Sequence, residues 1–145
     1  SSPSLLKSAD SIEGDILIQV LPTSPFITNV EINNFVKTMI KNNYDTLISV
    51  EEKQIACVYK NKPINFDKFK INPPSQTMQP VQIYSTVLMG WKYKNYIGNM
   101  KKYNCAYHGG SGKIGFFPLR GLSTIDIDTK EDFKFVKELI ESKKT

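Results

Sequence analysis

Hydrophobic residues first gather in residues 15–21, a nearly continuous apolar run that is typical of a strand buried on both faces. Pro22-Thr23-Ser24-Pro25 ends this run, because each proline fixes φ and lacks a backbone donor. Thr28 and Glu31 have the spacing of a capping box, and apolar side chains recur at helical spacing after them. Residues 46–50 form another apolar run, so this region predicts a strand–helix–strand unit.

The rest of the chain alternates strand patterns with polar connections. Residues 54–59, 81–88 and 114–119 have the composition of strands, while the polar, proline-containing region 65–80 indicates a loop. Residues 130–142 predict a final helix with one apolar face, formed by Phe133, Val136, Leu139 and Ile140. The pattern as a whole favours an α/β fold with a mostly parallel sheet and flanking helices.

Residues 91–102 interleave aromatic and basic side chains and leave two structures open, a helix face or an exposed hairpin. Base stacking on nucleic acid is one use of such a pattern. An amphipathic element that packs on its own domain or on a partner subunit is the favoured alternative.

The composition narrows the class of protein. The chain has 145 residues, enough for one domain with a core, and a net charge of +5. Almost all of the positive charge is scattered lysine, since Arg120 is the only arginine, so a nucleic-acid groove is not expected. No apolar run is long enough to cross a membrane. Cys57 and Cys105 lack metal-type spacing, and we expect reduced thiols in a cytoplasmic protein.

His108-Gly109-Gly110-Ser111-Gly112-Lys113 resembles a phosphate-binding loop only superficially. The first glycine of that motif would fall on Tyr107, and Ile114 stands where a metal-binding Ser or Thr is required. We therefore expect a flexible connection here and a surface position for His108.

Asp126 and Asp128 are the candidate metal ligands. Residues two apart in extended backbone point to the same side, so both carboxylates could face one Mg²⁺ ion. Thr129 and Asp132 then have the spacing that caps a helix. The alternative interpretation is that these aspartates only serve turn and cap geometry.

Several segments, in this order, resemble one family. They are residues 15–21 with Pro22-Thr23-Ser24-Pro25, then residues 47–50, Ser75-Gln76 before residues 81–88, and residues 113–115 leading to Asp126-Ile127-Asp128-Thr129 and Asp132-Phe133. This order resembles the acylneuraminate cytidylyltransferases, or CMP-sialic acid synthetases, over most of the chain. The resemblance implies a Rossmann-like nucleotidyltransferase fold.

The resemblance also implies a reaction and a set of site residues. Family members transfer CMP from CTP to an acidic nine-carbon sugar and release pyrophosphate. By this resemblance Asp126 and Asp128 are the catalytic, Mg²⁺-binding residues, and Thr23, Ser24 and Gln76 contact substrate. A homodimer is expected, with residues 81–102 as the dimerisation element.

The chain departs from the family pattern at three places. Leu21 replaces a usual Gln, Ser75 replaces a frequent Arg, and Ser85-Thr86-Val87 replaces a common Asn-Gly-Ala. These changes remove groups that would hold an acidic sugar, which leaves a related sugar or an inactive binding module as alternatives. A nucleotide-sugar-dependent glycosyltransferase fits less well, because only one helix is expected after Asp128.

The family's first strand and Gly-rich nucleotide loop have no counterpart before Asp15. We therefore expect either a fragment of a longer enzyme or a reduced homologue, in which residues 1–14 are a linker or a truncated segment and residues 15–145 form a partial domain. On this interpretation the fold is incomplete at its N-terminus, and the chain alone is not active.

Overall fold

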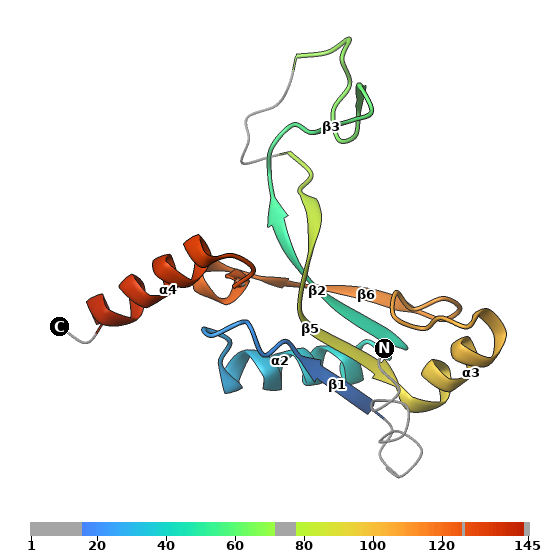
Figure 1. Cartoon of the computed structure of the whole chain (residues 1–145). Coiled ribbons are helices and arrows are strands. Elements are labelled where there is room, and N and C mark those ends of the chain that lie inside the picture. The colour runs from blue at the N-terminus through green and yellow to red at the C-terminus, as the bar shows by residue number, and fades with distance from the viewer. Residues whose placement is uncertain (1–15, 72–77, 126, 144–145) are drawn as a thin grey trace.

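The computed structural model describes residues 16–71, 78–125 and 127–143. Residues 1–14, expected to be a linker, lie outside this part. A four-stranded sheet occupies the centre, in the order β1-β5-β2-β6 (Figure 1). Its strands are β1 (Ile16–Val20), β2 (Thr46–Lys53), β5 (Val81–Lys92) and β6 (Ile114–Leu119). The helices are α2 (Asn29–Lys41), α3 (Tyr93–Tyr103) and α4 (Lys130–Lys143), with a short 3₁₀ helix, η2 (Gly121–Thr124), after β6.

Strand directions confirm the α/β class with flanking helices. β5 pairs antiparallel with both β1 and β2, and β2 pairs parallel with β6. β1, β2 and β6 therefore run in one direction and β5 alone runs in the other. The expected strand–helix–strand unit is present as β1-α2-β2, but β5 lies between its two strands. This insertion depends on pairing between distant segments, which local patterns do not encode.

Helix α2 begins with the expected capping box. The Glu31 backbone N–H donates to the Thr28 hydroxyl at 3.2 Å, and the Thr28 N–H donates to the Glu31 carboxylate at 3.2 Å. Phe35 and Met39 point inward and are fully buried. They form the first core cluster on one face of the sheet, together with Leu47, Val87, Leu88 and Leu119.

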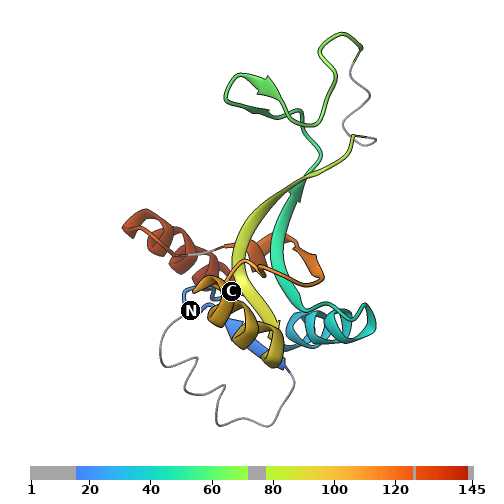
Figure 2. The same ribbon diagram turned by 90° about the vertical axis from the view of Figure 1, so that its right-hand side faces the viewer.

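The opposite face of the sheet is covered by α3 and the loop after it (Figure 2). Trp91 and Tyr96 are fully buried, with ring centroids 5.4 Å apart in an edge-on arrangement. The second core cluster contains Leu17, Ile48, Met89, Trp91, Tyr96 and Ala106. The ambiguous region 91–102 is thus mostly a helix that packs on its own domain. None of the described helices is both long and apolar enough to span a bilayer.

The outer halves of β2 and β5 leave the sheet as a two-stranded arm (Figure 1). Beyond β2 the chain forms a small ribbon, β3 (Val58–Tyr59) paired with β4 (Lys62–Pro63). Its turn residues, Lys60 and Asn61, have φ of 50° and 66°, as a tight hairpin requires. The strand expected over residues 54–59 is therefore shorter than predicted and belongs to this ribbon.

Candidate functional site

The carboxyl ends of β1, β2 and β6 share one edge of the sheet because these strands run in the same direction. This is the edge at which α/β proteins usually bind ligands. After β1, the Leu21 N–H donates to the Val87 carbonyl at 2.9 Å, and the Ile127 N–H donates to the Thr23 carbonyl at 3.1 Å. These bonds join the Pro-Thr-Ser-Pro loop, β5 and the segment before α4, which lie far apart in sequence.

The two loop residues expected to contact substrate differ in exposure. Thr23 is exposed beside the segment that leads into α4. Ser24 is only 5% exposed, and its hydroxyl has no hydrogen-bond partner among the described residues. A buried, unpaired hydroxyl is costly and is usually explained by a partner that completes it.

Asp128 is exposed at the start of α4, where the expected cap is present. The backbone N–H groups of Asp128 and Thr129 both donate to the Asp132 carboxylate at 3.1 Å, and the Asp132 N–H donates to the Thr129 hydroxyl at 3.0 Å. The Asp128 N–H, with smaller contributions from Thr129, lowers the pKa of Asp132 below its usual value. The Asp132 carboxylate is therefore occupied by the hydrogen bonds that cap the helix, whereas the Asp128 carboxylate has no hydrogen bond within the described residues.

Two of the predicted site residues, Asp126 and Gln76, lie outside the described residues. In the part that the structure covers, no three His, Cys, Asp or Glu side chains gather as a ready-made metal site. At this edge the exposed Asp128 carboxylate is an oxygen donor that a cation could use. Mg²⁺ is commonly bound through one or two carboxylates together with water and substrate phosphates, so this donor fits the metal.

A β-bulge lies beside the loop, at a place that the sequence pattern did not reveal. The register between β2 and β5 shifts between Ile48 and Val50, and Thr86 has a φ of 56°. The Ser49 and Ser85 hydroxyls lie 2.7 Å apart, and the Leu88 N–H donates to the Ser49 hydroxyl at 2.9 Å. Positive φ favours glycine and is strained for a β-branched residue. Thr86 occupies the position that is Gly in the Asn-Gly-Ala of the family pattern. That glycine is the feature of the pattern from which a positive φ could have been predicted here.

Replacing Thr86 with glycine is expected to raise the free energy of unfolding by about 1 kcal/mol, because relief of the left-handed strain exceeds the entropic cost of glycine. Urea denaturation measures the change. Thr86→Ala is the matched control, since alanine keeps the Cβ atom and with it the strain. Destabilisation by Thr86→Gly would show that the Thr86 hydroxyl bond to the Ser85 carbonyl, 2.7 Å long, outweighs the strain.

The glycine-containing loop after α3 is a structural connection that is bonded to the helix. Asn99 is 3% exposed, and its amide donates to the Gly109 carbonyl at 2.9 Å and accepts from the Ser111 N–H at 2.9 Å. The Lys113 N–H donates to the Asp45 carboxylate at 2.7 Å. These backbone donors are occupied within the protein, which agrees with the rejection of a phosphate-binding loop. His108 is exposed, as expected.

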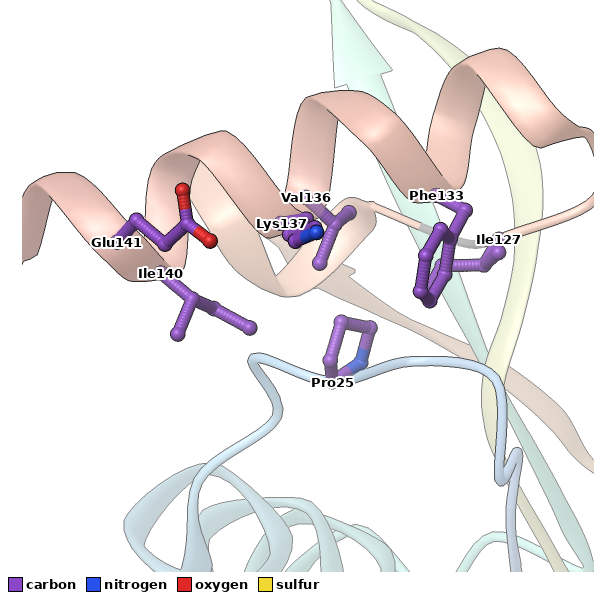
Figure 3. A pocket seen from close by; sticks show the side chains of 7 residues that line it. All are labelled: Pro25, Ile127, Phe133, Val136, Lys137, Ile140 and Glu141. Atoms are coloured by element: carbon purple, nitrogen blue, oxygen red, sulfur yellow. The ribbon is translucent and has the colours of Figure 1, made fainter.

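Two hollows lie at or near the candidate edge. An apolar groove of about 280 Å³ runs between α4 and the Pro-Thr-Ser-Pro loop, and Figure 3 shows Phe133, Val136 and Ile140 facing Pro25 across it. A polar pocket of about 260 Å³ lies at the base of the arm. It is lined by Glu52, Gln54, Pro80 and Arg120. Sequence reasoning assigned none of these four residues to a site.

Sequence comparisons identify neither a protein family model nor a curated protein that matches this chain. Solved structures do match its fold. The bifunctional IspDF from Campylobacter jejuni matches with a TM-score of 0.60 and 14% identity, over 90% of this chain and 33% of that protein. The 4-diphosphocytidyl-2C-methyl-D-erythritol synthase from Anaerococcus prevotii matches with a TM-score of 0.63 and 11% identity, over 97% and 67%. The chain thus spans about a third of the first and two thirds of the second. At these identities the comparison establishes the fold alone.

Proposed function

We propose that this chain contributes to a Mg²⁺-dependent cytidylyltransferase that joins CMP from CTP to an acidic nine-carbon sugar. The observation that carries the proposal is the meeting of the Pro-Thr-Ser-Pro loop with the Asp128 segment, through the Ile127–Thr23 hydrogen bond of 3.1 Å. The name of the Anaerococcus protein describes a product with a diphosphocytidyl group, which supports cytidylyl transfer on this fold.

The proposed reaction is a displacement at the α-phosphorus of CTP. The anomeric hydroxyl oxygen of the sugar forms the new P–O bond, the bond to pyrophosphate breaks, and the hydroxyl proton passes to solvent. When bound, Mg²⁺ would supply the neutralisation of triphosphate charge on which phosphoryl-type transfer mainly depends. Asp126 and Asp128 would hold the metal. Thr23, Ser24 and Gln76 would position the substrates against it.

The direct test measures pyrophosphate release by the full-length protein with CTP, Mg²⁺ and a panel of nonulosonic acids. 2-C-methyl-D-erythritol 4-phosphate serves as the comparison acceptor, and ATP and GTP as comparison nucleotides. We expect release with CTP and at least one nonulosonic acid. Release only with the erythritol phosphate would keep cytidylyl transfer but overturn the sugar class. No CTP binding by calorimetry would favour the inactive binding module instead.

A homodimer is part of the proposal, with the arm as its contact. Within residues 81–102, the exposed apolar side chains include Ile83 and Tyr84 at the arm's base, whereas Trp91 and Tyr96 are buried in the chain's own core. Phe69 and Ile71, beyond the β3–β4 ribbon, are 86% and 98% exposed. Such exposed apolar surface is typical of an interaction site. Sedimentation of the wild type and of Phe69→Ser with Ile71→Ser measures the expected shift from dimer to monomer.

A further inference from the structure

The polar pocket at the base of the arm lies where β6 ends beside β2. Leu119 of β6 lies opposite Glu51 of β2 in the parallel register. Arg120, which follows the end of β6, and Glu52, which follows Glu51 within β2, line the pocket together with Gln54 and Pro80. The pocket therefore lies at the carboxyl end of β6, where ligands of α/β proteins commonly bind.

The two charged side chains of this pocket, Arg120 and Glu52, do not form an ion pair with each other. Arg120 is exposed, and within the described residues it forms no ion pair. The Glu52 carboxylate instead accepts a hydrogen bond of 3.1 Å from the Gln82 amide. Gln54 is positioned by a bond of 3.0 Å from its amide to the Met78 carbonyl. A guanidinium and a carboxylate thus face the same space, with Glu52 and Gln54 oriented by neighbours on the arm.

The two opposite charges of Arg120 and Glu52 indicate which class of ligand fits the pocket. A guanidinium presents a planar fork of donors that matches a carboxylate with two parallel hydrogen bonds. A carboxylate such as Glu52 accepts hydrogen bonds from hydroxyl groups and disfavours a ligand that is only anionic. A polyhydroxy acid satisfies both residues. The volume of about 260 Å³ is below the usual range for small-molecule pockets, about 300 to 1,000 Å³, so the pocket suits part of a sugar rather than a nucleotide.

We propose that Arg120 and Glu52 form the subsite that selects a sugar acid, with Arg120 binding its carboxylate and Glu52 accepting its hydroxyl groups. This inference rests on the proposed function and names the residues that would determine its acceptor. The family pattern's arginine is replaced by Ser75, and Arg120 is the only arginine in the chain. The η2 turn and residues 125–128 connect Arg120 directly to the Asp128 segment, so the acid-binding subsite and the proposed metal ligands follow one another along the chain.

The test measures equilibrium binding of N-acetylneuraminic acid and of its methyl ester to the full-length protein by calorimetry, with and without CMP. The variants are Arg120→Gln, Arg120→Lys and Glu52→Gln. Lys53→Gln is the matched control, because its exposed side chain lies on the other side of the strand from Glu52. Thermal unfolding of each variant checks that the fold is kept.

We expect Arg120→Gln to weaken binding of the acid by about tenfold or more, as loss of a charge-assisted bond does. The wild type should prefer the acid over the ester by a similar factor, and Arg120→Gln should bind both alike. Arg120→Lys should retain part of the preference, Glu52→Gln should weaken both ligands, and Lys53→Gln should change neither. Equal binding of acid and ester by the wild type, no binding of the acid, or an unchanged preference in Arg120→Gln would overturn the assignment.

Steady-state kinetics separates this subsite from the proposed function and from a phosphate contact. If Arg120 binds the sugar carboxylate, Arg120→Gln raises KM for the acid and leaves KM for CTP unchanged. A raised KM for CTP with an unchanged KM for the acid would assign Arg120 to phosphate and overturn the inference. Arg120-dependent binding of the acid without pyrophosphate release would refute the transferase while keeping the subsite. If pyrophosphate release and KM for the acid are the same in the wild type and in Arg120→Gln, the transferase is supported and the subsite is refuted.

Discussion

Asp128→Asn is expected to lower the rate of CTP-dependent pyrophosphate release by about 100-fold or more, since a metal ion supplies several kcal/mol of charge stabilisation. The change removes one negative charge from an exposed side chain that forms no hydrogen bond within the described residues. The free energy of unfolding should therefore stay within about 0.5 kcal/mol of the wild type, as for other surface substitutions. Initial rates over a Mg²⁺ titration measure the effect, and a higher Mg²⁺ requirement in the variant is expected.

Glu131→Gln is the matched control for this variant. It removes the same charge from an exposed residue in the first turn of α4. Because Glu131 is not placed in the proposed site, it should retain the wild-type rate. Wild-type turnover by Asp128→Asn would remove Asp128 from the metal site and leave its segment with the cap geometry alone.

Asn99→Ala is expected to produce the largest loss of stability, about 3 kcal/mol, because it removes the partner of the buried Gly109 carbonyl and of two partly buried backbone groups of Ser111. Asn99 donates to the Gly109 and Ser111 carbonyls and accepts from the Ser111 N–H. Thermal unfolding should show a Tm lower by about 10 °C, given the size of the chain. The cause is local: without this amide, the loop between α3 and β6 must find water or a new conformation.

Asn99→Asp separates the two roles of this side chain. Aspartate keeps an acceptor for the Ser111 N–H but loses the donors to both carbonyls, so we expect a loss nearly as large as for alanine. Lys101→Ala, an exposed change on the same helix, should leave Tm unchanged. A loss below about 1 kcal/mol for Asn99→Ala would mean that water replaces the amide readily, as exposed polar groups allow.

Local elements were predictable where the signal is contained within one or two helical turns. The capping boxes at Thr28 and Glu31 and at Thr129 and Asp132 are present in the structure, with hydrogen bonds between 3.0 and 3.2 Å. The inward positions of α2, Phe35 and Met39, follow from helical periodicity for the same reason. These interactions join residues that are only three or four positions apart, so their spacing can be read directly from the sequence.

The candidate site was predictable only in part. The loop at Thr23 and the segment at Asp128 were identified from motif order, and the structure brings these two segments together. Arg120 was noted only for being a lone arginine, and its position beside Glu52 depends on the register of β2 with β6. Thr86 has a positive φ because it lies at the bulge in the pairing of β2 with β5, two strands that are distant in sequence. Asp126 and Gln76 lie outside the described residues, so their roles stay predictions.

Local patterns were enough to predict α2, α4 and the strand β1 with its proline stop, and to identify the loop motif and the acidic motif in their order along the chain. Tertiary structure alone decided that β5 enters between β1 and β2, that the outer parts of β2 and β5 leave the sheet as an arm, and that Glu52 and Arg120 share a pocket. The physical reason is the range of the interactions. Caps and amphipathic faces are set by neighbours along the chain, whereas strand order and register are set by which distant segments bury one another best.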